Sequence, residues 1–121
     1  MSDCPFCDLP QDRVVAGTEA MVVVRDHHPV TKGHTLIIPR RHVDSIFELD
    51  EKEWAQLHSL LRQTKAALDG EHQPAGYNVG TNVGQAAGQS QTHAYLHVIP
   101  RYPGDHPAPE GGVRHVLPWT R

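Results

Sequence analysis

Two histidines and a tyrosine alternate with apolar residues in the segment HAYLHVI, residues 93–99. A β-strand has a side-chain period of two, so this segment predicts a strand with one polar and one apolar face. The polar face would carry His93, Tyr95 and His97, and the apolar face would carry Ala94, Leu96 and Val98. The spacing therefore predicts three reactive or ligating groups side by side.

The loop directly before this strand, GQAAGQS at 84–90, consists of small and polar residues. Glycines such as Gly84 and Gly88 let the backbone come close to a ligand, and amide N–H groups with the Ser90 hydroxyl can hold phosphate oxygens. An ordinary hairpin loop is the alternative interpretation of this stretch. The imidazoles beside it favour an anion site that includes Gln89 and Ser90.

Histidine and tyrosine differ in their suitability to attack phosphorus. Imidazole has a reference pKa near ~6.5, so much of it is unprotonated at neutral pH, and the phosphoramidate it forms is labile. A phenol has a reference pKa near ~10, so only about one in a thousand is ionised at pH 7. An attack by Tyr95 would require nearby positive charge, for example from His93, His97 or Arg101.

The only two cysteines, Cys4 and Cys7, form one Cys-x-x-Cys motif. This is poor material for a secreted disulfide framework, so a metal clip or a redox pair is expected. A thioredoxin-like redox pair follows a strand, and no segment before Cys4 could form one. Zinc prefers four tetrahedral ligands, of which two cysteines at this spacing supply half.

The remaining sequence predicts the elements that position these groups. Strands are expected over 19–26, 34–39 and 76–83, and a helix over 48–70, with Asp50 as N-cap, Glu53 completing a capping box and Gly70 as the stop. The packed face of the helix would carry Trp54, Leu57, Leu60, Leu61, Thr64 and Leu68. Antiparallel strands with one long helix predict an α+β domain.

Length and charge limit the function classes. A chain of 121 residues suits one domain over 1–121, with an N-terminal Cys-x-x-Cys arm at 1–10 and a Pro/Gly-rich tail at 103–121. The net charge of -3 offers no basic stripe, so no nucleic-acid partner is expected. With no leader and no apolar run long enough to span a membrane, we expect a cytoplasmic protein without a membrane partner.

Three motifs together resemble the histidine triad (HIT) family. GQSQTHAYLHVIPR is similar to the family's triad strand and its preceding loop, and DHHPVTKGHTLIIPRRH is similar to its other conserved segment. NVGQAAGQS keeps the family's spacing from an asparagine to the loop. The resemblance implies a HIT-like fold of about five antiparallel strands and one long helix. It also implies a homodimer that binds a purine nucleotide of the AMP type, in a bacterial branch related to dinucleoside polyphosphate hydrolases and nucleoside phosphoramidases.

The resemblance implies a role for each matching residue. Asp26 would bind the ribose hydroxyls, and His27 would lie near the base with neighbouring apolar side chains. His34 would support the catalytic strand, and His97 would hold a phosphoryl oxygen. The phosphate or leaving group would contact the loop and the residues around it, namely Asn82, Gly88, Gln89 and Ser90.

The middle triad position, where the family has its nucleophilic histidine, is Tyr95 here. Three interpretations stay open: a nucleotide-binding protein with little or no hydrolysis, an enzyme that uses Tyr95 or another nucleophile, and a chain in which a histidine was substituted. A zinc-stabilised interaction protein without a nucleotide role is a further alternative. Gln91 and Thr92, which are not apolar, also depart from the family pattern on the leaving-group side.

Zinc-carrying members of the family take two ligands from histidines that match His42 and His93. The resemblance therefore implies a structural zinc site of Cys4, Cys7, His42 and His93. Zinc there would fix the N-terminal arm against the triad strand. The C-terminal tail, with Trp119, would reach across to the other subunit of the dimer.

Overall fold

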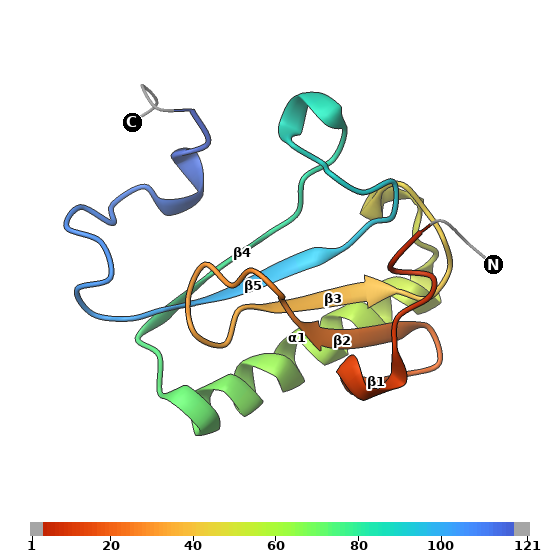
Figure 1. Cartoon of the computed structure of the whole chain (residues 1–121), viewed down its shortest axis with the longest axis horizontal. Helices are drawn as coiled ribbons and strands as arrows, with labels where there is room; N and C mark the ends of the chain where they lie inside the picture. The colour runs from red at the N-terminus through yellow and green to blue at the C-terminus, as the bar shows by residue number, and fades with distance from the viewer. Residues whose placement is uncertain (1–3, 118–121) are drawn as a thin grey trace.

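A computed structural model describes residues 4–117 of the chain. Five strands form one antiparallel sheet in the order β1-β2-β3-β5-β4, and one long helix, α1, packs on it (Figure 1). The bounds are β1 Val14–Gly17, β2 Met21–Arg25, β3 Thr35–Pro39, α1 Glu51–His72, β4 Gly76–Gly80 and β5 Leu96–Arg101. The expected α+β fold of about five strands and one long helix is confirmed.

The two central strands β2 and β3 are buried along almost their whole length, which is typical of strands covered on both faces. One face packs against α1 through Met21, Val23, Ile37, Leu57, Leu60, Leu68, Leu96 and Val98. The other face carries Val22, Val24, Leu36 and Ile38, and the N-terminal arm packs on it with Phe6 and Leu9. Tyr95 belongs to this second face, so the candidate chemistry lies opposite the helix.

Helix α1 begins as its sequence predicts and ends two residues later than expected. Asp50 accepts a bond from the Glu53 N–H, and the Glu53 carboxylate accepts one from the Asp50 N–H, which is a complete capping box. Gly70 lies inside the helix, so its prediction as the stop is wrong. The left-handed residue is Gln73, at φ 48°, because Pro74 follows and cannot continue a helix.

The prediction that Trp54 lies on the packed face is also wrong, since 40% of its surface is exposed. Glu53 takes that place on the face, with 5% exposed. Its carboxylate accepts two bonds from Arg41, at 2.8 and 3.1 Å, and these compensate for the burial of a charge.

Strand β5 begins at Leu96, three residues later than the predicted start at His93. Its alternation is confirmed, since Leu96, Val98 and Pro100 are buried and the residues between them are half-buried. His93 precedes the strand and is fully buried, so it does not share an exposed face with Tyr95 and His97. β5 pairs with β3 only opposite Thr35–Ile37. Before this paired segment, the Ala94 N–H donates to the Val43 carbonyl, which lies outside β3.

Other boundaries differ in smaller ways. β4 ends at Gly80, so the predicted strand over 76–83 is too long, and β1 is a strand that the sequence pattern did not reveal. Residues 103–117 contain one short 3-10 turn, Gly112–Arg114, and otherwise irregular backbone, as their prolines and glycines predict. Trp119 lies outside the described residues. Within the described residues, no helix is long and apolar enough to cross a membrane.

Candidate functional site

Three polar side chains meet where β2 ends and β3 begins, beside the start of β5. Asp26 directly follows β2, His34 directly precedes β3, and His97 faces them because it pairs with Leu36 of β3. The His34 Nε2 atom lies 2.9 Å from His97 Nδ1 and 3.4 Å from an Asp26 carboxylate oxygen. The sheet register thus joins residues from three separate segments into one hydrogen-bonded chain.

The backbone fixes where the protons of this chain lie. The Val30 N–H donates to His34 Nδ1 at 3.0 Å, so a neutral His34 carries its proton on Nε2. That proton is directed at His97 Nδ1 and Asp26, which leaves the proton of a neutral His97 on its own Nε2. His97 is thereby held as a hydrogen-bond donor from Nε2, a suitable state for contacting a phosphoryl oxygen.

Burial lowers the pKa of both histidines, because a charged imidazole loses water solvation. For His34, the Asp26 carboxylate partly offsets this by raising the pKa, and His97 lowers it further. For His97, Asp26 is the opposing influence. Both imidazoles are therefore held neutral at physiological pH, in agreement with the proton positions.

Tyr95 lies between the N-terminal arm and His97. Its ring meets Phe6 edge-on at 4.9 Å between centroids and His97 at 5.1 Å. Thr81 donates a 2.7 Å bond to the Tyr95 carbonyl and so fixes the backbone before β5. The Tyr95 hydroxyl lies 3.4 Å from the Ser90 hydroxyl, which brings the phenol to the edge of the loop predicted to hold phosphate.

A hollow of about 290 Å³ opens in front of these residues. Its apolar side is lined by Pro5, Phe6, Leu9 and Leu36, and its polar side by Arg13, Asp26, His27, His28, Ser90, Gln91 and Tyr95. An apolar slot for a flat ring beside a carboxylate and a hydroxyl is suited to a nucleoside. Asp26, His27, Ser90 and Tyr95, predicted from separate motifs, thus share one hollow.

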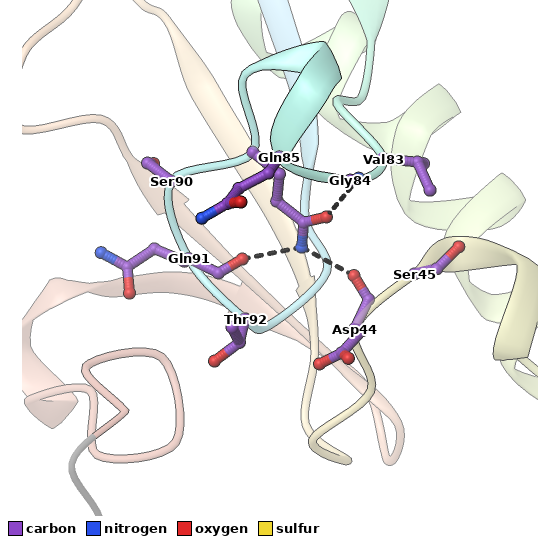
Figure 2. Close-up of a pocket in the computed structure, with 9 residues that line it drawn as sticks. Asp44, Ser45, Val83, Gly84, Gln85, Ser90, Gln91 and Thr92 are labelled. Carbon is purple, nitrogen blue, oxygen red and sulfur yellow. Dashed lines mark hydrogen bonds between the residues drawn. The ribbon is translucent and has the colours of Figure 1, made fainter.

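Gln89 is placed differently from what its predicted role suggests. Its side-chain oxygen accepts from the Gly84 N–H at 2.8 Å, and its side-chain nitrogen donates to the carbonyls of Asp44 and Gln91, both at 2.7 Å (Figure 2). In this structure Gln89 braces its own loop. Gly88, at φ 91°, provides the left-handed residue of that loop.

A second hollow of about 390 Å³ is lined by this loop together with Asp44, Ser45 and Thr92 (Figure 2). It shares Ser90 and Gln91 with the first hollow, so the two meet at these residues. Asn82 is exposed and lines neither of them. Sequence reasoning did not single out Phe6, Leu9 or Thr81, and their spacing carries no periodic signal that could have done so.

Four potential metal ligands lie close together: Cys4, Cys7, His42 and His93. Their ligand atoms all lie within 4.8 Å of one another. The His93 Nδ1 atom is 3.3 Å from Cys4 Sγ, 3.5 Å from Cys7 Sγ and 3.2 Å from His42 Nδ1. Tetrahedral zinc, with bonds of about 2.3 Å to sulfur and 2.0–2.1 Å to nitrogen, separates its ligands by roughly 3.3–3.8 Å. The distances from His93 to the other three donors fit such an ion to within a few tenths of an ångström.

The orientation of His93 supports the same chemistry. Its Nε2–H donates to the Pro39 carbonyl at 2.7 Å, which turns the lone pair of Nδ1 toward the two sulfurs. Such a backbone acceptor behind the ring is the usual partner of a metal-binding histidine. Burial lowers the pKa of His93, with a smaller opposing influence from Pro39, so the ring is kept in the neutral form that binds metals.

Known proteins resemble this chain in both sequence and structure. The protein called Protein hit from Bacillus subtilis is 35% identical over 105 residues, covering 83% of this chain and 72% of its own length. The AP-4-A phosphorylase of Mycobacterium tuberculosis is 33% identical over 107 residues, covering 84% of this chain and 55% of that enzyme. The chain therefore spans only about half of that relative.

Solved structures share the fold as well. A HIT family protein from Bacillus anthracis superposes with a TM-score of 0.78 at 34% identity, covering 85% of this chain and 76% of that one. A Zn-bound histidine triad family protein from Mycobacterium smegmatis gives 0.76 at 30% identity, covering 88% and 80%. The HIT domain itself matches residues 10–104. With the sheet order, the Asp26–His34–His97 chain and these matches in agreement, the protein belongs to the HIT domain family.

Proposed function

We propose that the protein binds a purine nucleotide of the AMP type in the 290 Å³ hollow and hydrolyses nucleotide substrates weakly or not at all. The observation that carries the proposal is the lining of this hollow, which sets Asp26 and Ser90 against an apolar wall of Phe6, Leu9 and Leu36. Its volume is near the lower end of the ~300–1,000 Å³ of ligand sites, which suits one nucleotide unit. The AP-4-A phosphorylase among the relatives is in keeping with such a ligand.

Weak hydrolysis follows from the surroundings of Tyr95, which the family resemblance places at the nucleophile's position. Its hydroxyl lies beside the neutral hydroxyl of Ser90, and His97 directs its unprotonated Nδ1 toward His34. A phenol with a reference pKa near ~10 needs a base or a cation to attack phosphorus at neutral pH. The aryl phosphodiester that such an attack forms would also be hydrolysed slowly in the second step.

Calorimetry with AMP tests the binding, and the Tyr95→His variant tests the assignment of the lost nucleophile. We expect measurable AMP binding by the unmodified chain, and hydrolysis of adenosine phosphoramidate that rises by orders of magnitude in Tyr95→His. No detectable binding at millimolar AMP would refute the first part. Turnover in the unmodified chain that disappears in Tyr95→Phe would show instead that Tyr95 is itself a nucleophile.

We also propose a structural zinc ion bound by the cluster of Cys4, Cys7, His42 and His93. The support is the set of donor distances, the bond between His93 and Pro39, and the Zn-bound relative from Mycobacterium smegmatis. Metal analysis of protein purified without added zinc or chelator is expected to give one equivalent per chain. A value below about half an equivalent would contradict the proposal.

A homodimer in the cytoplasm completes the proposal. β4 is an edge strand with Val79 exposed, and Val113, Val116 and Leu117 of the tail are exposed as well, which gives apolar surface for a second copy. Zinc binding requires the thiolate forms of Cys4 and Cys7, which a reducing compartment maintains. Light scattering after gel filtration should give twice the chain mass, and a monomer at micromolar concentration would refute the dimer.

A further inference from the structure

We infer that the metal cluster controls the nucleotide hollow through Phe6, so that the metal ion and the nucleotide bind cooperatively. The inference rests on the proposed function and adds its regulation. Phe6 lies between Cys4 and Cys7, in a turn closed by a 3.1 Å bond from the Cys7 N–H to the Cys4 carbonyl. Whatever holds the two sulfurs therefore holds this ring.

The Phe6 ring is in contact with both sites. Its centroid lies 5.9 Å from the ring of His93, in the metal cluster, and 4.9 Å from the ring of Tyr95, in the nucleotide hollow, with an edge-to-face arrangement in each case. It also lines the hollow together with Pro5 and Leu9. One aromatic side chain thus forms a wall of the ligand site and packs on a ligand of the metal site.

The anchoring of the arm decides how strongly the two sites are coupled. Within the described residues, the backbone hydrogen bonds of segment 4–10 are local, and pairing with the sheet begins at Val14 of β1. Arg13 adds a 2.9 Å bond to the Arg25 carbonyl at the same end. At the other end the arm meets the body at the thiols of Cys4 and Cys7, beside His42 and His93. Four metal bonds there would hold the turn more firmly than the thiol–imidazole contacts and the apolar packing of Phe6 do without metal.

Linkage makes the effect reciprocal. If metal holds Phe6 in place and nucleotide needs that wall, each ligand must raise the affinity of the other by the same factor. Coupling between neighbouring sites is typically 5- to 150-fold, and a single packed aromatic ring places the expected value at about tenfold.

The test uses the full chain with zinc and AMP as probes. AMP affinity is measured by calorimetry on zinc-loaded and chelator-treated protein, with circular dichroism to monitor the helix. Zinc affinity is measured by competition with a chromophoric chelator, with and without saturating AMP. The rate of zinc release into excess chelator is also measured with and without AMP. This rate shows whether AMP helps the protein to retain zinc, and it does not require the metal-free protein to stay folded.

Phe6→Ala and Leu9→Ala form a matched pair for this test. Both side chains line the hollow and pack on the same apolar face, but only Phe6 lies inside the Cys4–Cys7 turn. In the unmodified chain we expect zinc to tighten AMP about tenfold, and AMP to tighten zinc and slow its release by a similar factor. Phe6→Ala should reduce these factors to about one. Leu9→Ala should weaken AMP in both metal states and keep the factors.

Each failure has a distinct meaning. AMP binding that is unaffected by zinc overturns the coupling, and a tenfold effect that persists in Phe6→Ala overturns the role of Phe6 in it. Either result leaves the nucleotide site standing. No AMP binding to zinc-loaded protein overturns the proposed function, and the coupling fails with it.

Discussion

The side chain of Gln89 is expected to hold the loop at 84–92 in place before any ligand arrives, and Gln89→Ala tests this. The substitution removes three hydrogen bonds: one from the Gly84 N–H at 2.8 Å and two to the carbonyls of Asp44 and Gln91 at 2.7 Å. No other part of the Gln89 side chain is left to contact phosphate. Its contribution to nucleotide binding would therefore be indirect.

The magnitude follows from these bonds. A net value of about 0.5–1.5 kcal/mol for each would give roughly 1.5–4.5 kcal/mol, and partial access to water reduces this to about 1–3 kcal/mol. Gln89→Ala should therefore lower the protection of the Gly84 amide against hydrogen exchange by roughly 5- to 150-fold. Global stability should change little, because the loop lies outside the core.

Hydrogen exchange measured by NMR on nucleotide-free protein is the appropriate assay, since it separates bracing from direct contact with a ligand. Gln63→Ala is the control, because Gln63 is an exposed helix residue whose side chain bonds only Ser59 at 3.0 Å among the described contacts. It should leave Gly84 unchanged. Equal Gly84 protection in Gln89→Ala and the unmodified chain, with weaker AMP binding in the variant, would refute the bracing role and favour direct contact.

Three further predictions concern stability. Gly33→Ala should destabilise the chain by about 1–3 kcal/mol in urea denaturation and weaken AMP binding, because φ is +90° there and a Cβ would lie 2.9 Å from His72 beside the turn that positions His34; unchanged stability would contradict it. Glu53→Gln should cost about 1–2 kcal/mol at pH 7 by removing the charged bonds from Arg41. The hydrogen bond from Arg41 lowers the pKa of Glu53 in the folded protein. The stabilisation is therefore complete above the pKa that Glu53 has in the unfolded chain, and it is lost as the pH falls through the lower pKa of the folded state. A variant whose stability falls with acid pH in the same way as that of the unmodified chain would refute it. Burial lowers the pKa values of His34, His93 and His97 below the ~6.5 of an unfolded histidine. Around that pH the unfolded chain therefore binds more protons than the folded one, and the free energy of unfolding should fall between pH 7.5 and 5.5. A free energy of unfolding that stays constant over this range, with metal content held constant, would count against the burial of these histidines.

Features that depend on neighbours in the sequence were predictable. The capping box of Asp50 and Glu53 formed as its spacing predicts, because both partners lie within one helical turn. The alternation of β5 also held, because strand geometry alone sets it. The predicted end of α1 was wrong by two residues. A glycine such as Gly70 permits a helix to end without requiring it to, whereas Pro74 prevents the helix from continuing.

The candidate site was only partly predictable for a related reason. The sequence contained the residue types and, through three motifs, the family, so Asp26, His34 and His97 could be named before their contacts were known. The positions of their protons could not be predicted, because the nitrogen that carries each proton depends on the Val30 N–H. The full burial of His93 could not be predicted either, because it depends on the Pro39 carbonyl behind the ring.

The sequence by itself determined that a histidine-rich segment follows a small-residue loop and that a tyrosine stands between its two histidines. Only the tertiary structure decided what each member faces. His93 meets two thiols, His97 meets His34, and Tyr95 meets Phe6 and Ser90. The physical reason is that these partners lie far apart along the chain, and sheet register and a packed N-terminal arm, neither of which is encoded in local spacing, bring them together.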